Sequence, residues 1–208
     1  MPKIVLADDH PLLLEGLYNQ LNNLGYTNLF KAQNGSEALH IIVEEEPDIA
    51  VLDIEMPIMD GLSIAKHCQG LNLRTKFVIL SYHKETEFIA KAKMLNLSGY
   101  ILKEDALTEI ENCIQTILEG REYYSSVFET ADIKKVNSTL DLLQILSPSE
   151  LKILKLIAQN NSSKEISDQL FISERTVEKH RSNIITKLQL KGKPNSLYEW
   201  TVDNRMFI

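Results

Sequence analysis

The sequence has no long apolar run of the kind that membrane proteins carry. None of its apolar stretches approaches the roughly 18 residues that a membrane-spanning helix needs, and its N-terminus lacks the basic start and apolar core of a secretory signal peptide. We therefore expect a cytoplasmic protein with no membrane partner. Cysteine is also scarce: Cys68 and Cys113 lie outside any CxxC or Cys/His pattern, so we interpret both as free thiols packed on helices.

Positive charge is in deficit over most of the chain, which by itself argues against a nucleic-acid partner. The net charge is −7. However, residues 1–140 carry 12 lysines and arginines against 21 acids, whereas residues 141–208 carry 10 against 8. Within 160–194 the count is 7 against 4. An acidic first part and a mildly basic last part indicate two domains with different partners.

Short apolar runs alternate with segments of helical spacing from residue 3 to residue 120. The helical segments repeat an apolar residue every three or four positions, as in Leu107, Ile110, Ile114 and Ile117. This alternation predicts βαβ units, whose right-handed crossovers make the strands parallel. We therefore predict an α/β fold with a doubly wound, five-stranded parallel sheet, flavodoxin-like in type. Its strands are expected at Lys3–Ala7, Asn28–Ala32, Ile49–Asp53, Phe77–Ser81 and Gly99–Leu102.

Polar side chains stand where the predicted strands end. Asp8 and Asp9 follow the first strand, Asp53 ends the third, Ser81 ends the fourth and Lys103 follows the fifth. Because ligands bind outside the carboxyl ends of the strands in such sheets, we expect these groups at one edge. Three crowded carboxylates predict a hard divalent cation, with Mg²⁺ as the default. One carboxylate would then be free to attack phosphorus, while Ser81 and Lys103 contact phosphoryl oxygens.

Four motifs around these residues agree in order and spacing. "LADDHPL", "VLDIEMPIMDGL", "VILSYH" and "GYILKE" resemble the acidic pair, phospho-acceptor loop, hydroxyl strand and lysine strand of a response-regulator receiver domain. The resemblance implies that Asp53 is the phospho-acceptor and that a histidine kinase is the phosphodonor. It also implies that Asp9 binds the metal directly, that Asp8 assists through water, and that the backbone carbonyl of Glu55 completes the site. Tyr100 matches the aromatic switch position whose inward or outward setting reports phosphorylation.

Three residues near this site leave other interpretations open. His10 lies beside the acids but precedes Pro11 at a predicted helix start, and we favour a purely structural role for it. Tyr100 could instead be an ordinary core aromatic. Glu104 stands where many receiver domains have proline, so a cis peptide bond is less expected there.

The segment at 121–146 shows no continuous period. We expect a helix at about residues 125–136 and interpret "KVNSTLD" as a flexible joint of polar residues. The chain is accordingly divided into a receiver domain at 1–121, a linker at 122–145 and a small all-α domain at 146–208.

The last region is helical by pattern. "SPSE" and "SSKE" each supply a capping box, formed by Ser147 with Glu150 and by Ser162 with Glu165. A short turn, "FIS", leads to a third helix at about 174–189, and a fourth helix is expected after Pro194. The third helix carries an apolar stripe of Val177, Ile184 and Leu188 opposite a polar face. This layout predicts a helix-turn-helix whose second helix enters the major groove, with a solvated amphipathic helix as the alternative.

The stretch "LSPSELKILKLIAQNNSSKEISDQLFISERTVEKHRSNIITKL" resembles the LuxR-type helix-turn-helix, and the whole chain is similar to the NarL/FixJ class of response regulators. The resemblance implies double-stranded DNA as a partner. The predicted DNA-binding residues are Glu178, Lys179 and Ser182 at base edges, Lys164, Thr176, Arg181 and Lys187 at phosphates, and Arg175 on the same outward face. Glu178 either accepts from a cytosine amino group or orients Lys179 or Arg175. Asn160 and Gln189 replace glycines that the family usually has, so both turns are expected to differ slightly.

Taken together, these patterns predict a phosphorylation-controlled transcription factor rather than an enzyme, and a homodimer when it is phosphorylated. One alternative is a phosphatase with an aspartate nucleophile, but its usual DxDx[TV] loop is not matched by "DIEMP". The other is an interaction protein that dimerises through its first domain without needing phosphate.

Overall fold

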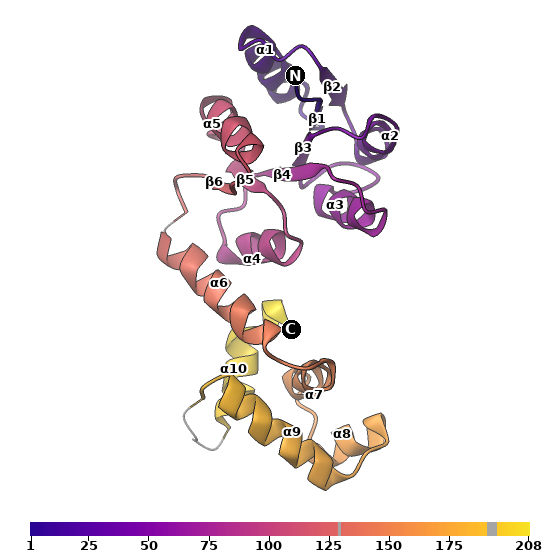
Figure 1. The fold of residues 1–208 in the computed structure, drawn as a ribbon, viewed down its shortest axis with the longest axis vertical. Helices are drawn as coiled ribbons and strands as arrows, with labels where there is room; N and C mark the ends of the chain where they lie inside the picture. The colour runs from indigo at the N-terminus through magenta and orange to yellow at the C-terminus, as the bar shows by residue number, and fades with distance from the viewer. Residues whose placement is uncertain (129, 191–194) are drawn as a thin grey trace. The chain divides into compact units, whose positions relative to one another are not determined.

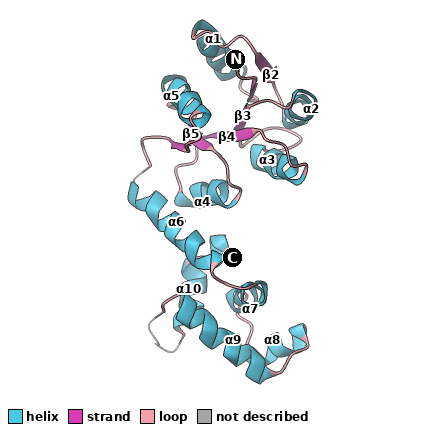
Figure 2. Cartoon of the chain, viewed as in Figure 1, coloured by secondary structure: helices cyan, strands magenta, loops and turns pink. Residues whose placement is uncertain are grey.

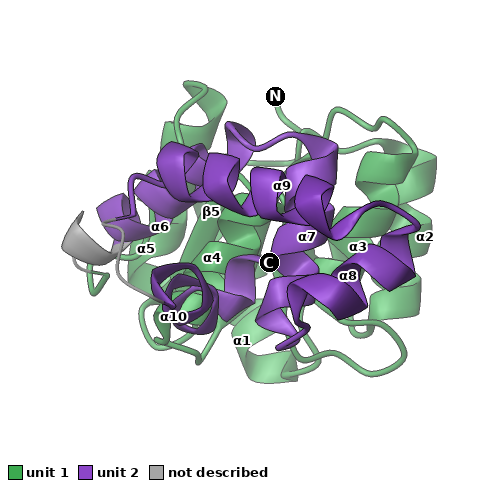
Figure 3. Ribbon diagram, turned by 90° about the horizontal axis from the view of Figure 1, so that it is seen from below, with its two compact units in different colours: residues 1–130 green, residues 131–208 purple. Residues whose placement is uncertain are grey.

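The computed structural model describes residues 1–128, 130–190 and 195–208. Its contacts divide the chain into two compact units, residues 1–130 and residues 131–208, which Figure 3 colours separately. Each unit has its own hydrophobic core, so each is described by itself. In the described part of the chain, no helix combines the length and the apolar character needed to cross a membrane.

Within residues 1–128, the centre of the first unit is a six-stranded parallel sheet (Figure 2). Its strands are β1 (Ile4–Ala7), β2 (Leu29–Ala32), β3 (Ile49–Asp53), β4 (Lys76–Ser81), β5 (Gly99–Leu102) and β6 (Tyr123–Tyr124). They lie in the order β2-β1-β3-β4-β5-β6. The five predicted strands are confirmed to within one residue, but the predicted count is one too low because β6 pairs with β5. Two residues are too few to show the alternation by which a strand is recognised.

Helices cover both faces of this sheet. They are α1 (Pro11–Asn23), α2 (Gly35–Glu45), α3 (Gly61–Gly70), α4 (Thr86–Met94) and α5 (Ala106–Leu118). Helices α1 and α5 lie on one face, whereas α2, α3 and α4 lie on the other (Figure 1). Both cysteines are buried free thiols, Cys68 on α3 and Cys113 on α5, as predicted. Burial raises the pKa of Cys68 to about 11, so it stays an inert thiol at neutral pH.

The register of the sheet aligns the polar ends of its central strands. Ala7 pairs with Leu52, so the residue after each, Asp8 or Asp53, lies at the same level. Ser81 pairs with Leu102, which places Lys103 one position beyond it. The strands that lead to these residues are buried on both faces, as expected for a parallel sheet covered by helices.

The segment after β6 differs from the prediction. Helix α6 (Thr130–Gln144) runs through "KVNSTLD", so the predicted flexible joint is wrong and the predicted helix begins later and extends further. The polar side chains there find hydrogen-bond partners within the helix itself: the hydroxyls of Ser138 and Thr139 both donate to the carbonyl of Lys135. Such back-bonding makes hydroxyl residues tolerable inside a helix, which a reading of composition alone overlooks.

The second unit is a helical bundle built on the two predicted capping boxes. Its helices after α6 are α7 (Pro148–Ala158), α8 (Ser163–Leu170), α9 (Glu174–Lys187) and α10 (Ser196–Asp203), with a short 3₁₀ turn at Arg205–Phe207. Both capping boxes are present, and both reciprocal hydrogen bonds are made in each. The predicted stripe is buried, and its members Val177, Ile184 and Leu188 pack in the core of this unit. Helix α10 confirms the predicted fourth helix, although Pro194 lies outside the described residues.

The two turns at which the family usually has glycine both use left-handed backbone here. Asn160 has φ +65° and Gln189 has φ +54°. These are values that glycine adopts freely and that cost other residues about 1 kcal/mol. Both positions thus take a backbone conformation typical of glycine although they carry side chains.

Glu150 links the start of α7 to the end of α9. Its carboxylate accepts from the amide of Ser147 at 2.7 Å and from the ammonium of Lys187 at 2.7 Å, and its side chain is almost fully buried. Burial alone would raise the pKa of Glu150, but the bonds from Lys187 and Ser147 outweigh it and hold the pKa below its usual value. A carboxyl whose pKa is lowered by folding stabilises the fold above its unfolded-state pKa, and this stabilisation is lost as the pH falls through the folded-state pKa.

We therefore expect Glu150→Gln to lower the free energy of unfolding of the second unit by about 1–2 kcal/mol at pH 7, since the capping geometry is kept but the ion pair is lost. The difference from wild type should shrink as the pH is lowered from 6 toward and below about 4. Trp200 is the single tryptophan and packs against this core, so its fluorescence during urea unfolding reports this unit.

The matched control is Glu165→Gln, which makes the same replacement of a carboxylate by an amide in the capping box of α8. Glu165 is exposed and bonds only to Ser162 in the described part of the chain. The urea midpoint of the Glu165→Gln variant should therefore stay close to that of wild type. Equal losses for the two variants would show that capping, rather than the Lys187 pair, accounts for the effect.

Candidate functional site

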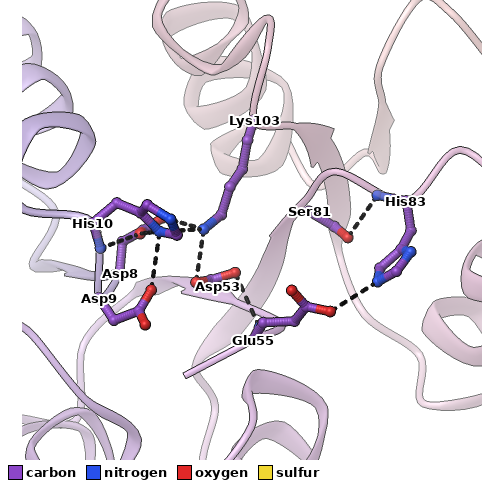
Figure 4. Close-up of polar contacts among 8 residues, drawn as sticks. All are labelled: Asp8, Asp9, His10, Asp53, Glu55, Ser81, His83 and Lys103. Atoms are coloured by element: carbon purple, nitrogen blue, oxygen red, sulfur yellow. Dashed lines mark hydrogen bonds and ion pairs between the residues drawn. The ribbon is translucent and has the colours of Figure 1, made fainter. Parts of the chain in front are cut away.

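The carboxyl edge of the sheet carries a buried ion cluster centred on Lys103 (Figure 4). The ammonium of Lys103 lies 2.7 Å from Asp53 Oδ2 and 3.0 Å from Asp8 Oδ2. All three side chains are at least 98% buried. The structure thus brings together residues from the ends of β1, β3 and β5, as the sequence predicted.

Burial and pairing act in opposite directions on this cluster. Burial raises the pKa of Asp53 above its usual value, and the ammonium of Lys103 and the amide of Glu55 compensate only in part. Burial would lower the pKa of Lys103, but Asp53 and Asp8 outweigh it and raise the pKa above its usual value. Lys103 therefore stays charged at neutral pH, and Asp53 is a more basic carboxylate than an exposed aspartate.

The same edge has the composition of a cation site. Oxygens of Asp8, Asp9 and Asp53 and a ring nitrogen of His10 lie within 4.8 Å of one another. One buried oxygen of each aspartate is paired only with Lys103 (Asp8 and Asp53) or with the ring of His10 (Asp9) among the described residues. Three carboxylates against the single charge of Lys103 leave an excess of two negative charges, which matches a divalent cation. Carboxylate oxygens are the ligands that hard divalent ions prefer, so the residues present fit such an ion.

His10 takes part in this cluster, a contribution that its position before Pro11 did not predict. Its Nδ1 lies 2.9 Å from Asp9 Oδ1, 3.1 Å from Asp8 Oδ1 and 3.3 Å from the ammonium of Lys103. Its amide donates to Asp8 Oδ1 at 2.8 Å. His10 also precedes Pro11 at the start of α1, so the predicted structural role is compatible with these contacts. The signal in the sequence was its position directly after the two acids.

Ser81 and Tyr100 are connected through the backbone of His83. The amide of His83 donates to Ser81 Oγ at 3.0 Å, and the hydroxyl of Tyr100 donates to the carbonyl of His83 at 3.0 Å. Tyr100 is fully buried, and burial raises its pKa to about 12. Tyr100 is therefore set inward, with its hydroxyl bonded to the loop that follows Ser81.

The β3–α3 loop supplies a further contact to Asp53. The amide of Glu55 donates to Asp53 Oδ1 at 3.0 Å, and the carboxylate of Glu55 lies 3.2 Å from His83 Nε2. His83 was not singled out in the sequence, and its ring stacks on Phe88 with centroids 4.0 Å apart. No cis peptide bond occurs among the described residues, so the bond between Lys103 and Glu104 is trans.

In the second unit, α8 and α9 form the predicted helix-turn-helix. The predicted DNA-binding residues are exposed at Lys164, Arg175, Glu178, Lys179 and Ser182, and half-buried at Thr176, Arg181 and Lys187. Four of them have side-chain partners inside this unit, and two of these bonds are local: Thr176 bonds to the hydroxyl of Ser173, and Ser182 donates to the carbonyl of Glu178. Lys187 bonds to Glu150 and to the carbonyl of Ile145, so the structure gives its ammonium a structural role in place of a free surface position. Glu178 accepts a hydrogen bond from the hydroxyl of Ser163 on α8, a partner that neither sequence interpretation included.

Comparison with known proteins covers both units. Residues 4–115 match the family model for the response regulator receiver domain, and residues 144–198 match that for bacterial regulatory proteins of the luxR family. The chain is similar to the oxygen regulatory protein NreC of Staphylococcus epidermidis, at 32% identity over 98% of each chain. Among solved structures it is similar to the signal receiver domain of NarL from Mycobacterium tuberculosis, at 32% identity and a TM-score of 0.54, covering 58% of this chain and 98% of that one. A LuxR-family DNA-binding response regulator from Staphylococcus aureus aligns at 27% identity and a TM-score of 0.52, covering 57% of this chain and 98% of the other.

Gly61 begins α3 in direct contact with the backbone of Asp53. A Cβ atom at this position would lie 2.4 Å from the carbonyl oxygen of Asp53, so a larger residue must displace the strand end. Gly70, at the other end of the same helix, has open space around it.

We therefore expect Gly61→Ala to destabilise the first unit by about 1–3 kcal/mol through steric strain. Gly70→Ala serves as the control and should instead stabilise it by about 0.5–1 kcal/mol, because alanine restricts the unfolded chain. Urea unfolding followed by near-ultraviolet circular dichroism reports this unit, since six of the seven tyrosines lie in residues 1–130. Equal stability of Gly61→Ala and wild type would contradict the close approach.

Proposed function

The chain belongs to the response regulators of the NarL/FixJ class, and from this we propose that Asp53 takes a phosphoryl group from a histidine kinase and that the phosphorylated chain binds double-stranded DNA as a homodimer. It is a transcription regulator built from a receiver domain and a LuxR-type DNA-binding domain, and not an enzyme. The observation that carries the proposed site is the buried ammonium of Lys103 shared by Asp53 and Asp8.

Asp53 is proposed as the nucleophile in phosphoryl transfer. A carboxylate oxygen of Asp53 would attack phosphorus while the bond from phosphorus to the kinase histidine nitrogen breaks, leaving a neutral imidazole once that nitrogen is protonated. The product is an acyl phosphate. Burial supports this role because it makes the carboxylate more basic, and the amide of Glu55 holds the other oxygen in place.

Ser81 and Lys103 are proposed to bind the phosphoryl oxygens. Ser81 Oγ accepts from the amide of His83, so its own proton is free to be donated to a phosphoryl oxygen. Lys103 already contacts Asp53 Oδ2 and can place its positive charge against a second oxygen. Tyr100, bonded to the loop after Ser81, would then report the change as the proposed switch residue.

Asp8, Asp9, Asp53 and the backbone carbonyl of Glu55 are proposed to hold Mg²⁺, with Asp9 as a direct ligand and Asp8 acting through water. Such an ion would neutralise charge on the phosphoryl group during transfer. The excess of two negative charges at this edge and the close grouping of these carboxylate oxygens support the assignment.

The exposed face of α9 is proposed to enter the major groove of DNA. Lys179, Ser182 and Glu178 would reach base edges, while Lys164, Thr176, Arg175 and Arg181 would contact phosphates or support those that do. The bond from Ser163 favours a role for Glu178 in fixing the geometry between α8 and α9. Lys187 is the weakest member of the proposed set, since Glu150 already neutralises it.

Phosphorylation should be confined to Asp53, because it alone ends a central strand beside Lys103 and the carboxylate cluster. Incubation of the full chain with acetyl phosphate and Mg²⁺ is expected to add one phosphate by intact-mass spectrometry, and Asp53→Asn should add none. Asp60→Asn is the matched control, because Asp60 is an exposed N-cap acid seven residues away and asparagine caps equally well. Phosphate retained in Asp53→Asn would refute the assignment, and full labelling in excess chelator would refute the metal.

DNA binding should depend on pairing of two chains, because one domain has a positive excess of only three charges across 160–194. Two copies on adjacent half-sites double the phosphate contacts and add avidity. The slope of log K against log salt should therefore be about twice as steep for the phosphorylated chain as for a monomer.

Fragment 131–208, which lacks the acidic first unit, should bind DNA more readily than the unphosphorylated full chain. Analytical ultracentrifugation with a labelled duplex measures the stoichiometry, and the duplex can be selected from a random pool with the phosphorylated chain. One protomer bound tightly per duplex would show that the dimer argument is wrong.

A further inference from the structure

The β3–α3 loop, residues 54–60, places Glu55 beside Asp53, and we call it the acceptor loop. The amide of Glu55 donates to Asp53 Oδ1 at 3.0 Å. The strand side of the loop is fixed by the sheet, because the amide of Ile54 donates to the carbonyl of Leu80 at 3.0 Å. This bond does not reach the part of the loop that lies beyond Glu55, so that part needs another support.

Beyond Glu55 the acceptor loop makes a strained turn. The amide of Met59 donates to the carbonyl of Pro57 at 3.0 Å, and Ile58 between them has φ +76°. This combination is a γ-turn of the rare, strained kind, and a β-branched residue is seldom found at such a φ. Ile58 is also 80% exposed, so the packing of its own side chain does not hold the turn. Contacts from outside the loop are therefore needed to stabilise it.

The first residue of α2 supplies such a contact. The amide of Gly35 donates to the carbonyl of Pro57 at 3.2 Å, and Gly35 is buried. A Cβ atom on Gly35 would lie 1.9 Å from the carbonyl oxygen of Met59 and 2.7 Å from its carbonyl carbon. The φ of Gly35 is outside the left-handed region, so the backbone of α2 does not itself need glycine here. Glycine is needed because the backbone of the acceptor loop lies directly against it.

The start of α2 is held in place by its own cap. The side chain of Asn34 accepts from the amide of Glu37 at 2.9 Å, and the carboxylate of Glu37 accepts from the amide of Gln33 at 2.8 Å. These reciprocal bonds fix the backbone on both sides of Gly35. The strained turn of the acceptor loop thus rests against a well-ordered helix end that does not itself touch Asp53.

We propose that Gly35 is a positioning residue for phosphoryl transfer at Asp53. It acts through the carbonyl groups of Pro57 and Met59, and it keeps the acceptor loop in the conformation that directs the amide of Glu55 to Asp53. The same conformation sets the carbonyl of Glu55, which is a proposed ligand of the cation. A larger residue in place of Gly35 displaces the turn, and Glu55 moves with it. This inference rests on the proposed function, because it concerns the same phosphoryl group and cation.

The conformational effect is measured on the full chain without Mg²⁺, from the amide resonances of Glu55 and Ile54. In Gly35→Ala the amide proton of Glu55 should shift upfield, because its bond to Asp53 lengthens, while that of Ile54 should keep its position. Gly70→Ala is the control and should leave both resonances unchanged, since Gly70 has open space around it. A folded Gly35→Ala chain with an unchanged Glu55 resonance would overturn the proposal.

The effect on the reaction is measured as the rate of phosphorylation by acetyl phosphate, followed by intact mass over a series of Mg²⁺ concentrations. Gly35→Ala should raise the half-saturating Mg²⁺ concentration by about tenfold or more, as is usual when the support of a metal ligand is lost. The rate at saturating Mg²⁺ should change less. A chain that is merely destabilised would instead contain fewer reactive molecules at an unchanged half-saturating concentration, and that result would refute the positioning role.

Substitutions of Asn34 test the same contact without adding an atom to Gly35. Asn34→Ala removes the cap and loosens the start of α2, so the Glu55 resonance and the half-saturating Mg²⁺ concentration should move in the same directions by smaller amounts. Asn34→Ser keeps a capping oxygen and should behave as wild type. If Gly35→Ala does not fold, wild-type values for Asn34→Ala overturn the proposal.

The outcomes for the wild-type chain separate the two proposals. A wild-type chain that takes no phosphate from acetyl phosphate, or is labelled equally in excess chelator, refutes the proposed function or its cation, and the role of Gly35 with it. A wild-type chain that is phosphorylated with Mg²⁺, together with a Gly35→Ala chain of the same Mg²⁺ dependence, refutes the role of Gly35 alone.

Discussion

The ammonium of Lys103 is the interaction on which the carboxyl edge of the sheet depends. Asp8 and Asp53 are almost completely buried, and two such carboxylates facing each other in a dry site would repel and lose their hydration. Lys103 satisfies both at 3.0 and 2.7 Å, yet it leaves the cluster with unbalanced negative charge. The cluster is thus compatible with a stable fold, and its remaining negative charge still attracts a further cation. In the proposed mechanism, a phosphoryl group and its cation change the partners of Lys103, so phosphoryl binding and the conformational response both begin at its ammonium.

The main features of this edge follow from the sequence because they obey short-range rules. A buried parallel strand is a run of apolar residues, and its last residue is fixed by where that run stops, so Asp53, Ser81 and Lys103 could be assigned to one edge. The capping boxes at Ser147 and Ser162 are equally local, since each depends on a residue three positions away. Helix ends and strand ends were therefore predictable from spacing.

The features that were missed depend on contacts between residues far apart in sequence. The pairing of Lys187 with Glu150 was not predicted, because Glu150 lies 37 residues earlier and comes within reach only in the folded bundle. Strand β6 is too short to have a pattern and exists because Ser125 and β5 supply partners. The segment "KVNSTLD", predicted to be a flexible joint, is helical. Its hydroxyl side chains favour turns in isolation, but here they donate to a backbone carbonyl of the same helix.

The two-residue strand β6 also closes one side of the sheet. Without it, β5 would present a row of free amide and carbonyl groups, which is a template for adding a strand from another chain. Glu109 on α5 bonds to Ser125 and Ser126, which directly follow this strand, and so keeps β6 in place along the edge. The buried bonds of Glu109 therefore also protect against aggregation. A chain that loses them is expected to self-associate through the edge of β5, and soluble protein would be lost on storage before any loss of signalling is seen.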